Sequence, residues 1–165
     1  MKKLLGAAAF LLVMAPAAWA SPPAVPIGDQ EQLQSIMNEL NAEDLAYVPT
    51  ELPAHYEVSA TQTVYNQLTL SFTNTKYADG SAKSTASTIN FSAQPFKGKL
   101  AACAKGSDSS LKVAGKTVYV KAGHVVWRCM RSPSGNNVVV FANSPSLGYD
   151  VLERVIASTA RMKSS

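Results

Sequence analysis

The chain has 165 residues, of which 47% are hydrophobic and 16% charged, and its formal net charge is +4 at pH 7. This length allows one domain with a sizeable core and excludes an assembly of several domains. Residues 21–75 carry seven acidic residues and no lysine or arginine, whereas residues 76–165 carry thirteen basic and four acidic ones. Such asymmetry indicates either a basic binding face or an acidic N-terminal part that folds back against a basic body.

The first 20 residues have the layout of a bacterial secretory signal peptide. Lys2 and Lys3 precede an apolar run of about 15 residues, which is shorter than the roughly 20 that a transmembrane helix needs. Ala18-Trp19-Ala20 is a small-x-small cleavage signature, so we expect cleavage after Ala20 and no transmembrane span afterwards; a retained anchor is the alternative. The mature protein is then periplasmic or secreted.

Proline and glycine in "SPPAVPIG" predict an extended lead-in over residues 21–28, followed by a single domain over residues 29–165. "DQEQLQSIMNEL" has apolar residues at helical spacing, which predicts a helix that Asp29 caps and that ends near Leu45.

Most of the chain between residues 57 and 143 has strand character. The clearest strand is "NQLTLSFTNTKY", in which Leu68, Leu70 and Phe72 alternate with polar residues. Asp79-Gly80 and Ala114-Gly115 predict tight turns, and a turn of helix is expected around Leu100 to Cys103. The strand segments are residues 57–65, 66–77, 81–93, 111–113, 116–120, 124–131 and 138–143.

The segment "DVLERVIASTARM", residues 150–162, has the apolar periodicity of a closing helix. The predicted fold class is therefore α+β: an antiparallel meander sheet of about six or seven strands, with an N-terminal and a C-terminal helix packed on it.

Cys103 and Cys129 are the two cysteines of the chain. An even pair in an exported protein predicts a disulfide, here closing a loop of about 27 residues. Alternation along "HVVWRCMR" places Val125, Trp127 and Cys129 on one face of a strand, and His124, Val126, Arg128 and Met130 on the other. His124 and Cys129 would then lie about 17 Å apart, too far for a nucleophile and its base. This stretch is interpreted as a core strand rather than a catalytic site.

The sequence contains no GxSxG, GxxxxGK[ST] or HExxH motif and no acidic run with calcium-loop spacing, so no catalytic residue, metal ligand or cofactor is assigned. A basic cluster is the candidate binding face, although a solvated sheet face would look the same. Export makes nucleic acid an unsuitable partner and favours a protein or an anionic envelope component. The cluster comprises Lys97, Lys99, Lys105, Lys112, Lys116, Lys121, Arg128 and Arg131.

Four short motifs occur in order: Leu52 to Tyr56 ("LPAHY"), then "KYADGSAKS", "VAGKTVYV" and "VLERVIAST". With these motifs, residues 52–158 resemble the C-terminal domain of the MucB/RseB group, which are periplasmic regulators of extracytoplasmic stress sigma factors. They are similar also to a related domain of unknown function in extracytoplasmic parts of anti-sigma and sporulation proteins. The resemblance implies an antiparallel α+β fold and a non-catalytic binding role, and it assigns no partner and no functional residue.

The leading hypothesis is a small exported, non-enzymatic binding domain of the bacterial envelope with a regulatory role. The alternative is a secreted inhibitor or immunity protein that blocks the active site of another protein. A third hypothesis is an enzyme with an unrecognised site.

Overall fold

The computed structural model describes residues 45–64, 66–77 and 88–162. The signal segment, the lead-in, the helix expected from Asp29 and the Asp79-Gly80 turn lie outside these residues. Within the part that is described, α3 (Tyr149–Ser158) is the one α-helix, and two short 3-10 turns, η2 (Thr75–Tyr77) and η3 (Leu100–Ala104), accompany it.

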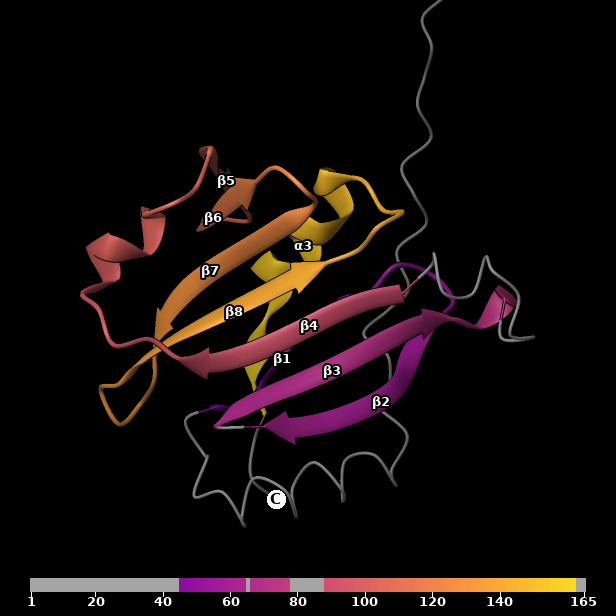
Figure 1. The fold of residues 1–165 in the computed structure, drawn as a ribbon, viewed down its shortest axis with the longest axis horizontal. Helices are drawn as coiled ribbons and strands as arrows, with labels where there is room; N and C mark the ends of the chain where they lie inside the picture. Colours follow the sequence, from indigo (N-terminus) through magenta and orange to yellow (C-terminus); the bar gives the residue numbers. More distant parts are fainter. Residues whose placement is uncertain (1–44, 65, 78–87, 163–165) are drawn as a thin grey trace, which may run out of the picture.

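The main element is a seven-stranded antiparallel sheet, as predicted (Figure 1). Its spatial order is β2-β3-β4-β8-β7-β6-β5. The prediction of one continuous meander is therefore wrong, because β4 is followed in space by β8. The strands are β2 (Tyr56–Val64), β3 (Gln67–Asn74), β4 (Thr88–Pro95), β5 (Ser109–Val113), β6 (Lys116–Lys121), β7 (Val125–Arg131) and β8 (Asn137–Asn143).

Two meanders, β2 to β4 and β5 to β8, meet at the pairing of β4 with β8. Turn chemistry explains the second meander at β5–β6, where Ala114 and Gly115 have φ values of 48° and 76°. Two successive left-handed residues form the turn whose twist suits a tight hairpin, as the sequence predicts.

The closing helix is shorter than predicted, because α3 ends at Ser158 and Thr159 is extended, with ψ 127°. The hydroxyl groups of Ser158 and Thr159 both donate to the carbonyl oxygen of Val155, which offers the backbone an alternative to another helical turn. The chain then forms β9 (Ala160–Arg161), which pairs with β1 (Tyr47–Val48) in a small separate sheet. Neither strand was expected from the sequence.

The hydrophobic core lies between α3 and one face of the seven-stranded sheet, here called the inner face. Figure 1 shows α3 behind β7 and β8, and the helix also contacts β5 and β6. Alternation in β3 is confirmed, since its three apolar side chains are buried. The fully buried core residues include Leu52, Leu70, Ile89, Phe91, Val118, Val126, Val138, Val140, Leu152, Val155 and Ile156.

Candidate functional site

The opposite face of the sheet, the outer face, carries a row of aromatic side chains that crosses three strands. Trp127 on β7 pairs with Phe141 on β8 and with Tyr119 on β6. The rings of Tyr119 and Trp127 are stacked, with centroids 5.8 Å apart. Because side chains alternate along a strand, the outward position of Trp127 follows from the inward position of buried Val126.

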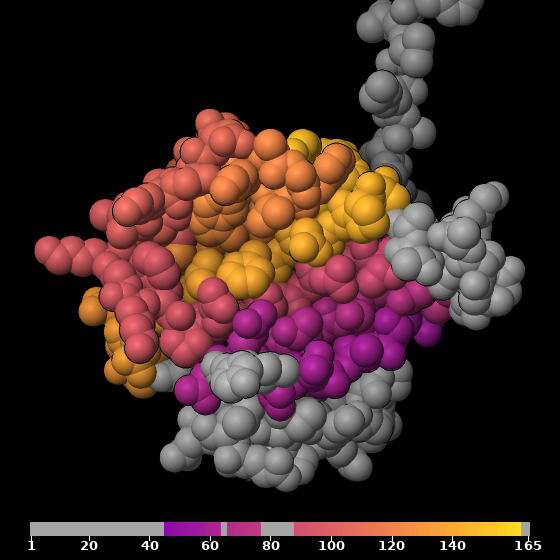
Figure 2. Space-filling view, in the orientation of Figure 1, coloured from indigo at the N-terminus to yellow at the C-terminus, as the bar shows by residue number. Residues whose placement is uncertain are grey.

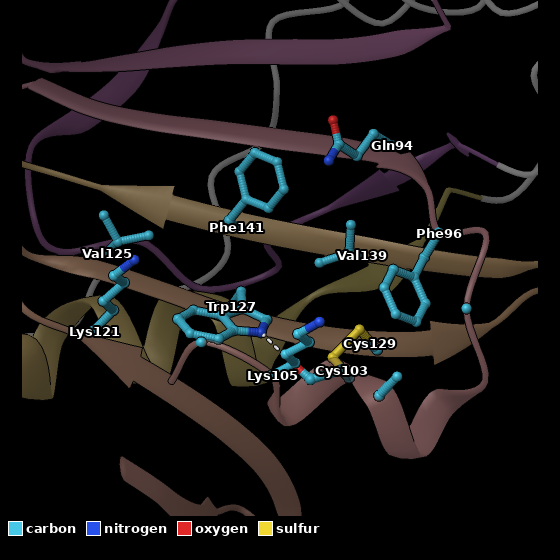
Figure 3. Close-up of a pocket in the computed structure, with 13 residues that line it drawn as sticks. Gln94, Phe96, Cys103, Lys105, Lys121, Val125, Trp127, Cys129, Val139 and Phe141 are labelled. Carbon is cyan, nitrogen blue, oxygen red and sulfur yellow. Dashed lines mark hydrogen bonds between the residues drawn. A yellow bond between two sulfur atoms is a disulfide. The ribbon is translucent and has the colours of Figure 1, made fainter. Parts of the chain in front are cut away.

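Trp127 and Phe141 of this row form the floor of an apolar pocket of about 620 Å³. The volume is typical of small-molecule sites, which are concave, mostly apolar and carry a few polar groups. Figure 3 shows the pocket between the outer side chains of β7 and β8 and the connection that follows β4. Its lining consists of Gln94, Phe96, Gly98, Ala102, Cys103, Lys105, Gly106, Lys121, Val125, Trp127, Cys129, Val139 and Phe141.

One wall of the pocket is the connection between β4 and β5, which folds over the sheet as η3. The disulfide between Cys103 and Cys129 is confirmed, with the two Cα atoms 6.0 Å apart, and it joins η3 to β7. The indole Nε1 of Trp127 donates to the carbonyl oxygen of Cys103 at 2.9 Å. Figure 2 shows this connection, in salmon, against the orange surface of β7 and β8.

The start of the same connection is held at β8. The side-chain Nδ2 of Asn137 donates to the carbonyl oxygen of Gly98 at 2.7 Å. Its backbone carbonyl oxygen accepts the backbone N–H of Phe96 at 2.8 Å. A Cβ at Gly98 would lie 2.8 Å from Cζ of Phe96, so glycine allows the aromatic ring to pack across this residue. The connection is therefore bonded to β8 near its start and to β7 at η3. The pocket is already formed in the absence of a ligand.

The outer face of β2 to β4 is polar instead. The hydroxyl of Thr73 donates to that of Ser59, and the hydroxyl of Ser71 donates to Oδ1 of Asn90. Ser92 marks the border, because it pairs with Thr69 of β3 on one side and with Phe141 of β8 on the other. The apolar surface is thus confined to one half of the sheet.

The predicted basic cluster divides among several places. Lys105 and Lys121 line the pocket, and Lys97 and Lys99 are exposed in the connection that forms its wall. Three others bond elsewhere: Lys112 Nζ to Thr117 Oγ1, Lys116 Nζ to the carbonyl oxygen of Ala157, and Arg131 Nε to that of Gly135.

Arg128 points to the inner face, opposite Trp127. It pairs with Val140 in β8, and its Nη1 is buried without a hydrogen-bond partner in the described ranges. Burial lowers the pKa of this guanidinium, and the neighbouring Tyr47 partly opposes that effect. Arg128 is therefore no part of the pocket.

His124 does not lie on the strand, contrary to the prediction. It precedes β7 in a turn with φ 58°, its ring stacks on Tyr149 with centroids 4.8 Å apart, and its Nδ1 is 2.8 Å from the carbonyl oxygen of Leu147. Cys129 is occupied in the disulfide. The two residues therefore have structural contacts and do not form a reactive pair.

The pocket itself was not predicted from the sequence. Of its lining, Val125, Trp127, the two cysteines and two of the lysines were singled out, whereas Val139 and Phe141 were not. The sequence does contain a signal for this apolar surface. The segment "VVVFAN" is apolar at consecutive positions, so β8 cannot present one apolar and one polar face. A strand that is apolar on both faces predicts a second packed or ligand-binding surface.

The described part of the chain has no helix with the length and hydropathy of a membrane span. It also has no group of three or more histidine, cysteine, aspartate or glutamate side chains placed to hold a metal ion.

Comparison with protein families, with curated proteins and with solved structures found no match to this chain.

Proposed function

We propose that this protein is an exported, non-enzymatic binding protein of the bacterial envelope and that its ligand places an apolar group in the outer-face pocket. The signal-like N-terminus and the disulfide support export, because disulfides persist in oxidising compartments. The resemblance of residues 52–158 to the MucB/RseB group supports the same non-catalytic role.

The pocket is the observation that carries the proposal. Trp127, Phe141 and Val125 remain partly exposed on a sheet face that could have been polar, as it is on β2 to β4. Leaving apolar surface in contact with water costs about 25 cal/mol per Å², and a bound apolar group would recover part of that free energy. Contiguous apolar surface with a polar rim commonly marks a binding site.

The composition of the lining supports binding rather than catalysis. Its polar side chains are one amide, Gln94, and two lysines, and its cysteines are joined in the disulfide. Histidine and carboxylate side chains most often transfer protons in enzymes, and none from the described residues lines this pocket.

The test is titration with Nile red, a neutral dye whose emission increases in apolar surroundings. Phe141→Gln should weaken binding about tenfold, because it replaces an apolar floor residue by a polar one of similar length. Thr69→Gln is the matched control: Thr69 and Phe141 flank Ser92 in the same row of the outer face, but Thr69 lies in the polar half. The control should bind the dye as the unmodified protein does. No saturable binding, or an equal loss in both variants while circular dichroism shows both folded, would contradict the proposal.

A further inference from the structure

We propose that the ligand of this pocket is an amphipathic anion, a long-chain carboxylate whose alkyl chain lies on the floor and whose carboxylate lies between Lys105 and Lys121. This inference rests on the proposed function, because it names the ligand class of the same site.

The floor favours an alkyl chain over a peptide. β7 and β8 are interior strands, since β7 pairs with β6 and β8, and β8 pairs with β7 and β4. Their backbone groups are already engaged in the sheet, so a peptide could not add to them as a further strand. The indole N–H of Trp127 is also engaged, by the carbonyl oxygen of Cys103. Peptide amides buried here would lose hydrogen bonds to water, whereas an alkyl chain has none to lose.

The charged residues at the edge of the pocket favour a negatively charged group on the ligand. Lys105 follows η3 and Lys121 ends β6, and both side chains line the pocket and are exposed. Figure 3 shows them on either side of the Trp127 ring. No carboxylate from the part of the chain that the structure describes lines the pocket, and Lys97 and Lys99 add positive charge in the adjoining connection.

Asp108 does not line the pocket, although its carboxylate lies near the backbone of Lys121 and reduces the local positive charge in part. Its Oδ2 accepts the backbone N–H of Ala122 at 2.6 Å, which holds it at the start of β5, outside the lining. Lysine ammonium groups attract a carboxylate without strict orientation, which suits a flexible amphiphile.

Trp127 is a built-in reporter for the experiment. The chain has two tryptophans, Trp19 and Trp127, and Trp19 precedes the expected cleavage site, so the exported protein that begins at Ser21 emits from the pocket alone. Three probes with the same alkyl chain are titrated below their micelle-forming concentrations: dodecanoate, dodecanol and dodecyltrimethylammonium. Dodecanoate should bind about tenfold more tightly than the cationic probe at low salt, since two exposed ion pairs supply that order of preference. The preference should shrink in high salt.

Lysine variants locate the charge. Lys105→Gln and Lys121→Gln should each reduce the preference for dodecanoate and together abolish it. Lys112→Gln is the matched control, because it removes the same charge from β5, where Lys112 bonds Thr117 outside the pocket. The control should keep the preference.

The outcomes separate the inference from the proposed function. Equal affinity for all three probes, or equal effects of Lys105→Gln and Lys112→Gln, would overturn the carboxylate but leave an apolar binding site. Tighter binding of an acidic peptide rich in leucine and phenylalanine than of dodecanoate would overturn the lipid-like ligand in favour of a protein segment. No response of Trp127 to any probe, with no heat of binding, would overturn both proposals.

Discussion

Successive residues of β7 face either the hydrophobic core or the pocket on the outer face. Val126 and Met130 pack in the core, while Trp127, between them, faces the pocket. The Trp127 ring is held by its stack on Tyr119 and by the hydrogen bond to Cys103. A ring fixed from two sides has little conformational entropy to lose when a ligand arrives, which favours binding.

Arg128 is the residue of this strand that the core accommodates least well. Its Nη1 is buried without a hydrogen-bond partner among the described residues. An unsatisfied buried polar group costs about 1–3 kcal/mol, so Arg128→Met should raise the free energy of unfolding by about 1 kcal/mol. Urea unfolding measures this change. Arg131→Met is the control from the exposed end of the same strand, and it should produce no gain. A loss of stability in Arg128→Met would show that the guanidinium is satisfied in solution.

At the scale of elements, the connection that carries η3 is the part of the fold that most depends on covalent linkage. It contributes buried Cys103 but few other apolar residues to the core, and β7 is the element it contacts most. The disulfide spans 26 positions in sequence.

Replacing both cysteines by alanine should lower the free energy of unfolding by about 3.5 kcal/mol in the chain-entropy account of disulfides. Urea unfolding of the oxidised protein and of the double variant gives the difference, and the unmodified protein in reductant should match the variant. The environment of Trp127 should also become more polar, because Cys103 would no longer be held at its indole. A difference below about 1 kcal/mol would show that the hydrogen bonds of Asn137 are enough to hold the wall.

For the whole molecule, the pairing of β4 with β8 decides whether the two meanders form one cooperative unit. Phe91 lies at this junction, fully buried, between Leu70 of β3 and Ala142 of β8. Residues from both meanders thus share one core, and unfolding of one half exposes the core residues of the other half to water.

Phe91→Ala should therefore destabilise both halves together, by about 3–5 kcal/mol. In the protein cleaved after Ala20, emission of Trp127 follows the β5 to β8 half, and far-ultraviolet circular dichroism follows all strands. The two transitions should coincide in the parent protein and shift together in the variant. Asn90→Ala, at the exposed neighbouring position of β4, should shift them by less than about 1 kcal/mol. Separate transitions for the two probes would mean that the halves unfold independently.

Much of the fold could be predicted because its signals are local. The alternation of Leu68, Leu70 and Phe72, the Ala114-Gly115 turn and the helical turn near Cys103 each depend on a few neighbouring residues. The disulfide could be predicted by counting, since two cysteines allow one intramolecular pair. The early end of α3 also has a local signal, which was overlooked: the hydroxyls of Ser158 and Thr159 both donate to the carbonyl oxygen of Val155.

By itself, then, the sequence determined the strand type, the two faces of each strand and the cysteine pairing, since side-chain alternation and turn residues act over a few positions. Only the tertiary structure decided that β4 lies beside β8, that β9 pairs with β1 and that η3 folds over the outer face. The pocket depends on these long-range arrangements. Its lining comes from residues 94–106, 121–129 and 139–141, whose separate segments carry no common local pattern. They meet because burying the inner face of both meanders in one core brings β7 and β8 side by side and leaves their outer apolar side chains adjacent.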